Sequence, residues 1–194
     1  MLGPVLILGA LGLFLFNMNT SADAEAQSTE VLLNLHQAAQ KTPPINSSAE
    51  QNVTKQPMID DQAMTEVIID GNSYIGYLVV PDLELELPVM SDWSYSGLKI
   101  SPCRYCGTVK GNDLVIMAHN YKSHFGNLSK LPLGTIVRFS DMDGNRWCYE
   151  IGLIETLEPS RVDEMTAGEY DLTMFTCTSG GSHRVAIRCN LSVQ

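Results

Sequence analysis

Residues 172–188 read LTMFTCTSGGSHRVAIR, two alternating runs joined by a loop rich in serine and glycine. In a β-strand successive side chains point to opposite faces, so alternation of this kind predicts strands. The first run ends on Cys177, and the second begins on Arg184. The stretch therefore predicts two adjacent strands that present a thiol and a guanidinium at neighbouring ends.

Similar short alternating or apolar runs occur throughout the chain from Glu66 onward. Short runs rich in valine, isoleucine, tyrosine and threonine are separated by turn signals, such as those at 70–72, 133–134 and 143–145. Many short strands at modest spacing favour a closed barrel or a sandwich. We expect an all-β domain with minor helices over residues 67–194.

The N-terminal segment is apolar, with no charged side chain in residues 2–18. Spanning a bilayer takes about 20 apolar residues, and roughly 17 is the lower limit. Residues 1–18 are therefore predicted to be a single-pass membrane anchor, with a cleaved signal peptide as the alternative. Both interpretations place the later residues outside the cytoplasm. Residues 19–66 have linker composition and helical spacing at 28–40, which predicts an extracellular stalk with a short helix.

The net charge argues against one class of partner, and the number of cysteines predicts an unpaired thiol. The chain has 194 residues and a formal net charge of −10, and it contains no strongly basic stretch. Nucleic-acid binding requires clustered lysine and arginine, so we expect no nucleic-acid partner. The chain has 5 cysteines. An odd number in an exported protein leaves at least one thiol without a disulfide partner in the same chain.

Three polar side chains lie at or near predicted strand ends. His119 follows the apolar run LVIM, Cys177 ends a second run, and Arg184 begins a third. A thiolate is a strong nucleophile, an imidazolium can protonate a leaving amine, and a guanidinium can stabilise a developing oxyanion. Taken singly, each of these residues has a common structural explanation. Together they suit acyl transfer from a peptide bond through a thioester.

Two motifs in the chain resemble those of the sortases, the cysteine transpeptidases of Gram-positive cell surfaces. TMFTCTSGGSHR (173–184) resembles their Thr-Leu-x-Thr-Cys…Arg signature, with Met174 in place of leucine. AHNYKSHFGNLSKL (118–131) resembles their Gly-His-Asn loop, with Ala118 in place of glycine. The resemblance covers residues 70–192, and histidine, cysteine and arginine occur in the sortase order.

The resemblance implies a closed sortase-type β-barrel of about eight strands. It also implies that Cys177 is the nucleophile, His119 the general acid/base and Arg184 the oxyanion or substrate-positioning group. The substrates would be surface proteins with a C-terminal Leu-Pro-x-Thr-Gly-like sorting signal. The acyl group would pass to an amine on a peptidoglycan precursor or on another surface protein, such as a pilin lysine. No cofactor or metal is expected. A housekeeping or accessory anchoring enzyme is the favoured subclass.

Two other functions are compatible with the sequence. One is a non-catalytic extracellular β-barrel module that binds a wall polymer or a protein, in which Cys177 is structural. The other is an exported thiol-disulfide protein that uses Cys103 and Cys106, although a structural disulfide or two free thiols is the favoured interpretation of this pair.

Arg188 lies four residues after Arg184 and shares its strand face, so it is a rival for the arginine role. His124 is expected to be solvated or packed within its loop.

Overall fold

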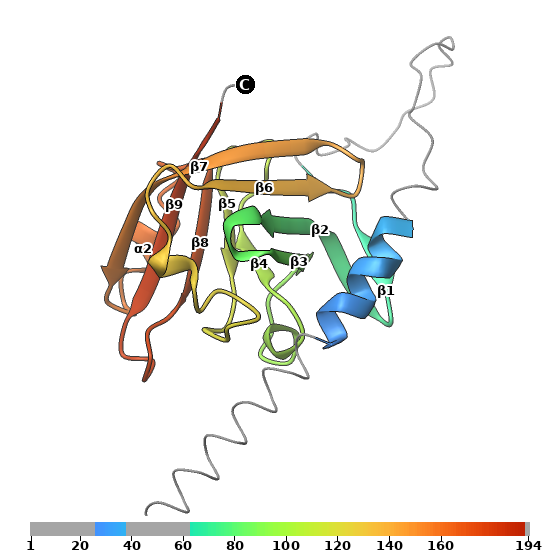
Figure 1. Ribbon diagram of the computed structural model, residues 1–194, viewed down its shortest axis with the longest axis horizontal. Helices are drawn as coiled ribbons and strands as arrows, with labels where there is room; N and C mark the ends of the chain where they lie inside the picture. Colours follow the sequence, from blue (N-terminus) through green and yellow to red (C-terminus); the bar gives the residue numbers. More distant parts are fainter. Residues whose placement is uncertain (1–25, 38–62, 193–194) are drawn as a thin grey trace, which may run out of the picture.

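The computed structural model describes residues 26–37 and 63–192 (Figure 1). The predicted anchor at 1–18 lies outside these residues. Within the described ranges, no helix has the length and apolar character needed to cross a membrane.

The described residues form one nine-stranded sheet, in the order β1-β2-β3-β4-β5-β8-β9-β7-β6. An additional antiparallel pairing between β2 and β6 closes strands β2 to β9 into a barrel, and β1 extends it beside β2. The expectation of a mostly β, closed barrel of about eight strands is confirmed. The strands are β1 (Val67–Ile69), β2 (Asn72–Val80), β3 (Leu85–Met90), β4 (Cys103–Cys106), β5 (Leu114–Met117), β6 (Ile136–Asp141), β7 (Arg146–Leu157), β8 (Leu172–Cys177) and β9 (Arg184–Leu191).

Closure of the barrel depends on a glycine in β2. Gly76 has a φ of +154°, and it lies where the pairing of β2 with β3 shifts register. A Cβ at this position would lie 2.1 Å from the carbonyl oxygen of Ser140 on β6. No side chain fits at that distance, so the close approach of β2 to β6 requires glycine.

Strand alternation divides the side chains between the barrel interior and its outer surface. Leu172 and Met174 of β8 and Ile187 of β9 point inward and join the main core. Phe175 of β8 and Ala186 of β9 point outward and belong to a smaller cluster with Met165. The outer face of β8 and β9 is therefore covered by other parts of the chain, and this face carries Cys177 and Arg184.

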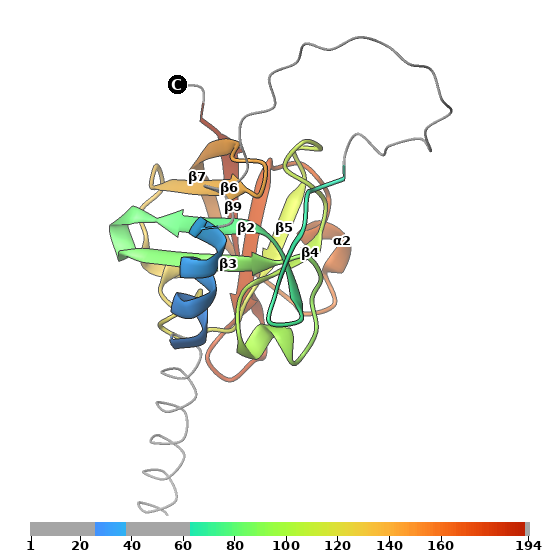
Figure 2. The same ribbon diagram turned by 90° about the vertical axis from the view of Figure 1, so that its right-hand side faces the viewer.

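Short helices connect the strands or cover them. They are η1 (Pro81–Leu83), η2 (Gly97–Lys99), η3 (Leu128–Lys130) and α2 (Val162–Met165), together with a longer helix at 26–37. Figure 2 shows that the longer helix crosses β2 and β3. Val31 and Leu35 are buried in this contact, and Ser28 Oγ donates to the Ile100 carbonyl at 2.9 Å. The helix expected near 28–40 is thus docked on the barrel.

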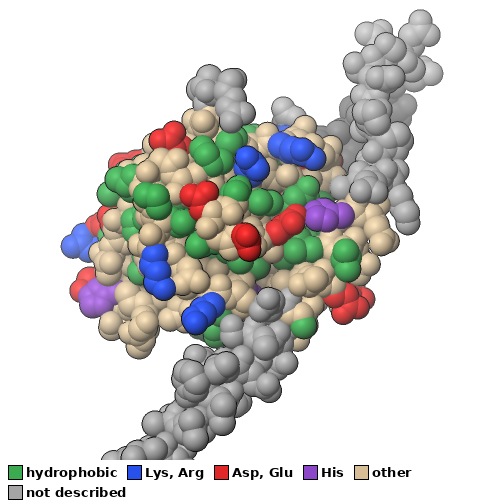
Figure 3. Space-filling view, in the orientation of Figure 1, with side chains coloured by type: hydrophobic (Ala, Val, Ile, Leu, Met, Phe, Trp, Pro, Cys, Tyr) green, Lys and Arg blue, Asp and Glu red, His purple; other side chains and the backbone are tan. Residues whose placement is uncertain are grey.

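Charged side chains are interspersed over the face of the barrel shown in Figure 3. Lysine and arginine side chains are scattered among aspartate and glutamate on this face, and they do not gather into one basic patch. This distribution agrees with the net charge of −10. The face shown in Figure 3 carries no continuous positive surface, and the absence of a nucleic-acid partner stays a prediction.

Candidate active site

The pairing of β8 with β9 brings Cys177 and Arg184 together. Their Cα atoms are direct antiparallel partners, the last residue of one strand opposite the first of the next. Side chains of directly opposed residues share a face of the sheet, with Cβ atoms about 4.5–5.5 Å apart. Both residues are half-buried. Nη1 of Arg184 donates to the carbonyls of Gly181 and His183, at 3.1 and 3.2 Å, and these bonds leave other guanidinium donors available.

His119 follows β5, which pairs with β8 on the side opposite β9, and it lies at the same end of the sheet as Cys177. Strands β5 and β8 are parallel, with Met117 opposite Phe175. The pairing continues past β5, because the Ala118 amide donates to the Phe175 carbonyl at 3.2 Å. One step further on, Asn120 Nδ2 donates to the Thr178 carbonyl at 3.4 Å. His119 therefore lies beside Cys177 in the extended register.

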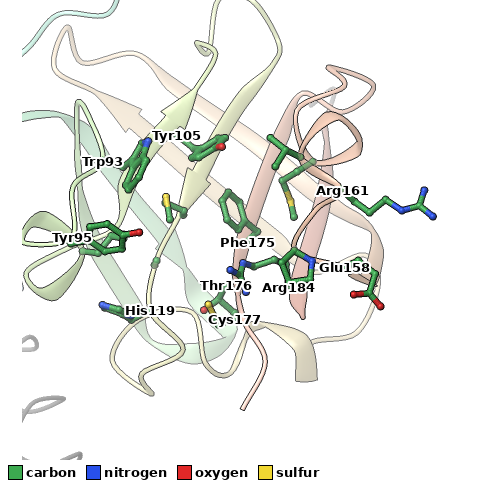
Figure 4. A pocket seen from close by; sticks show the side chains of 16 residues that line it. Trp93, Tyr95, Tyr105, His119, Glu158, Arg161, Phe175, Thr176, Cys177 and Arg184 are labelled. Atoms are coloured by element: carbon green, nitrogen blue, oxygen red, sulfur yellow. The ribbon is translucent and has the colours of Figure 1, made fainter. Parts of the chain in front are cut away.

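The His119 ring is not directed at the thiol. Figure 4 shows that the two side chains do not point toward one another. The imidazole instead packs on Tyr121, with ring centroids 4.8 Å apart and planes inclined by 32°. Burial lowers the pKa of His119 below its usual 6.5, and the nearby charge of Lys99 lowers it further. The ring is therefore mainly neutral at neutral pH, the form that can accept a proton.

A pocket of about 310 Å³ adjoins Cys177, His119 and Arg184 (Figure 4). Its lining is mainly apolar and aromatic, as in most ligand sites. The segment between β3 and η2, together with β4, supplies the aromatic rings on one side of the pocket. Strands β5 and β8 contribute residues between the two sides, and α2 contributes to the opposite side. In chain order the other lining residues are Trp93, Tyr95, Leu98, Tyr105, Met117, Ala118, Glu158, Pro159, Arg161, Val162, Met165, Phe175 and Thr176.

The aromatic side of the pocket is a connected series of rings. Trp93 contacts Tyr95 edge-on at 5.7 Å and stacks with Tyr105 at 6.2 Å, and Tyr105 contacts Phe175 edge-on at 5.4 Å. Tyr95 and Trp93 are exposed large apolar side chains. Sequence reasoning did not identify these residues. The available signal was the pair of aromatic residues in the polar stretch SDWSYSG, which begins with buried Ser91.

Arg188 does not line this pocket. It shares the outward face of β9 with Arg184, as the alternation predicts, but its partner across the strands is Thr173. Only 4% of the residue is exposed, and Nε pairs with Glu155 Oε1 at 2.9 Å. Of the two rival arginines, Arg184 is therefore the one at the thiol.

All five cysteines lie within the described residues, and none of them forms a disulfide there. Cys103 is fully buried, and its Sγ lies 3.8 Å from the sulfur of Met90. Burial raises the pKa of Cys103 to about 12. Burial also raises the pKa of Cys106 above its usual value. Reactive redox thiols have lowered pKa values, so the two free thiols do not suit thiol-disulfide exchange.

Two other histidines lie near the site without joining it. His124 is fully buried and packs on Tyr121, with ring centroids 5.5 Å apart, so it is packed within its loop and not solvated. His183 lies in the loop between β8 and β9, where its Nε2 is 3.1 Å from Glu158 Oε1. His183 thereby links that loop to the segment that follows β7.

Comparison with known proteins identifies the family to which the chain belongs. The profile of the family described as "Sortase domain" matches residues 78–192, more than half of the chain. The chain belongs to the sortase family. Members of this family are cysteine transpeptidases, and that general activity applies to this sortase. No curated protein sequence matches it significantly.

Solved sortases share the fold of this sortase. Sortase C1 from Streptococcus suis is 26% identical, with a TM-score of 0.55 over 62% of this chain and 74% of that chain. A sortase C from Streptococcus pneumoniae is 20% identical, with a TM-score of 0.64 over 85% and 97% of the two chains. A sortase C from Clostridium perfringens SM101 is 18% identical, with a TM-score of 0.57 over 87% and 91%. The housekeeping or accessory subclass favoured by the sequence stays a prediction.

Proposed function

We propose that this sortase cleaves a C-terminal Leu-Pro-x-Thr-Gly-like sorting signal through a thioester on Cys177 and transfers the protein to an amine acceptor. The direct pairing of Cys177 with Arg184 at the end of an apolar pocket carries the proposal. His119, in register with Cys177 on the far side of β8, completes the catalytic group.

In the first half-reaction the sulfur of Cys177 attacks the carbonyl carbon of the residue before the scissile bond. His119 takes the thiol proton, which requires its ring to rotate from Tyr121 toward the sulfur. The free donors of Arg184 hydrogen-bond the developing oxyanion. The C–N bond then breaks, and the proton on His119 passes to the leaving amine of glycine. The products are a thioester on Cys177 and the released C-terminal peptide.

In the second half-reaction an acceptor amine attacks the thioester carbonyl. His119, neutral again, takes a proton from the incoming nitrogen and returns one to the departing sulfur. A new amide bond forms, and the Cys177 thiol is regenerated. Arg184 serves the second tetrahedral intermediate in the same position as the first. Because a peptide bond is exchanged for an amide bond, the cycle needs no cofactor or external energy source.

The pocket fits an extended, apolar peptide segment. Its aromatic and aliphatic lining would bury the leucine and proline of a signal peptide, and it would limit the access of water to the thioester. The proposed substrates are surface proteins that carry such a signal. The proposed acceptors are a peptidoglycan precursor or a pilin lysine. Anchoring by residues 1–18, with the catalytic domain outside the cell, would place the enzyme beside both.

Trapping the acyl-enzyme tests the proposal. The full chain in detergent is incubated with a library of Leu-Pro-x-Thr-Gly-like peptides, and its intact mass is measured before and after addition of a small amine. We expect a peptide adduct that maps to Cys177, that disappears when the amine is added, and that is absent in Cys177→Ala. Peptide binding without any adduct would instead support the non-catalytic module.

A further inference from the structure

Arg188 is the most highly connected buried charged side chain near the pocket. Besides its ion pair with Glu155, Nη1 donates to Thr173 Oγ1 and to the Met165 carbonyl, both at 3.1 Å. Nη2 donates to the Glu164 carbonyl at 2.7 Å. All three guanidinium nitrogens therefore have acceptors. Two of these acceptors lie on barrel strands β7 and β8, and the other two lie on α2.

The α2 carbonyls that Arg188 contacts belong to the end of the helix. Amide groups beyond the helix use the carbonyls of Val162 and Asp163, because the Thr166 amide donates to both. The last carbonyls of a helix have no partner within it, and a cationic side chain there satisfies them and opposes the helix dipole. A helix of four residues is also far below the length that is stable alone. Arg188 thus caps a helix that depends on contacts with the barrel.

Helix α2 forms one side of the catalytic pocket. Val162 and Met165 line the cavity, and Met165 is buried in the outer cluster with Phe175, two residues before Cys177. Figure 1 shows α2 beside β8 and β9. The guanidinium of Arg188 also lies over the ring of Tyr170, 5.5 Å from its centroid, near the end of the same connecting segment. One side chain of β9 therefore holds the connection between β7 and β8 at two places.

We propose that Arg188 is a positioning residue for substrate, which holds α2 as the pocket wall against which the apolar part of the signal peptide packs. The inference rests on the proposed function. The bonds of Arg188 to Glu155 and Thr173 join β9 to the neighbouring barrel strands. Its two bonds to α2 carbonyls instead join β9 to the helix that forms a wall of the pocket. Its side chain lines no part of the pocket, so it acts through α2 and not on the reacting atoms.

The test compares Arg188→Met with Arg138→Met. The first keeps the apolar stem and removes every donor, and the second removes an exposed guanidinium from β6 as a matched control. For Arg188→Met we expect KM for the signal peptide to rise about tenfold with a smaller change in kcat, since a displaced wall weakens binding more than chemistry. Arg138→Met should match the wild type. Alkylation of Cys177 by iodoacetamide should proceed at the wild-type rate in both.

Hydrogen exchange separates this proposal from the failure of the proposed function, because it requires no turnover. In Arg188→Met, protection of residues 158–171 should fall about tenfold, while β5 and β8 keep theirs. Arg188→Lys, which retains a charge opposite Glu155, provides a second variant if methionine prevents folding, and it should lose protection at the same segment. Unchanged exchange at 158–171 in a folded variant would overturn the proposal. So would a uniform loss over the whole barrel.

Discussion

Replacing His124 by phenylalanine should make this sortase less sensitive to acid. His124 is fully buried in the loop that follows His119, and within the described structure neither ring nitrogen has a hydrogen-bond partner. Burial lowers the pKa of His124 to about 4, the like charge of His119 adds to the effect, and the backbone of Ile100 opposes it only in part. A protonated ring at this position would be a buried cation with no counter-charge.

The pKa values set the sign and size of the effect. Unfolded histidine has a pKa of about 6.5, so between about pH 6.5 and pH 4 the unfolded chain binds a proton that the folded protein does not. Stability therefore falls as the pH falls through this window. Relative to pH 7.5, the His124 contribution is a loss of about 1 kcal/mol at pH 5.5 and of about 2–3 kcal/mol at pH 4.5.

Urea unfolding at pH 7.5, 5.5 and 4.5 measures the effect (about 1 kcal/mol must be resolved). The carboxylates also titrate in acid, so the informative quantity is the difference between wild type and His124→Phe at each pH. That difference should shift in favour of the variant by about 2–3 kcal/mol from pH 7.5 to 4.5. His183→Gln, at a more exposed histidine, is the control. A difference that does not change with pH would refute the argument, because His124 would then titrate alike in both states.

Three further predictions concern the catalytic group and the paired cysteines. Arg184→Ala should lower kcat/KM by about 10²–10³ with little change in Tm, and Arg184→Lys should also be poor because it lacks the planar fork; wild-type kinetics in the alanine variant would exclude the oxyanion role. The kcat/KM of the wild type should fall as the pH drops through the lowered pKa of His119, below 6.5, because the protonated ring cannot accept the Cys177 proton; a pH-rate profile that is flat down to pH 5 would contradict this. Replacing Cys103 and Cys106 by serine should lower Tm, since Cys103 is buried, but leave kcat largely intact; a loss as complete as that in Cys177→Ala, in a folded protein, would point to the wrong thiol.

The arrangement of the hairpin residues could be predicted from local sequence. Alternation in 172–188 places Cys177, Arg184 and Arg188 on strand faces with a period of two, and the Ser/Gly loop predicts that the strands are adjacent. The register observed in the structure agrees, with Cys177 opposite Arg184. These features depend on backbone geometry and turn chemistry within a few residues, which is why they can be read from the sequence.

Other features depend on contacts between distant segments. His119 lies beside Cys177 because β5 pairs in parallel with β8, and no local pattern specifies that pairing. The aromatic side of the pocket forms because Trp93, from the segment after β3, stacks on Tyr105 of β4, and Tyr105 contacts Phe175 of β8. The helix near residue 30 could be predicted, but its docking through Leu35 could not.

The two arginines show this division most clearly. In the sequence they are equivalent, because both lie on one face of the same strand, about 13 Å apart. The sequence favours Arg184 because it lies nearer the loop and because it matches the arginine of the sortase signature. Only the tertiary structure shows why Arg188 differs: α2 folds over its end of β9 and supplies carbonyl acceptors that bury the guanidinium. The neighbours of a side chain across the fold, and not its position along the strand, decide whether its charge lines the pocket or is buried against α2.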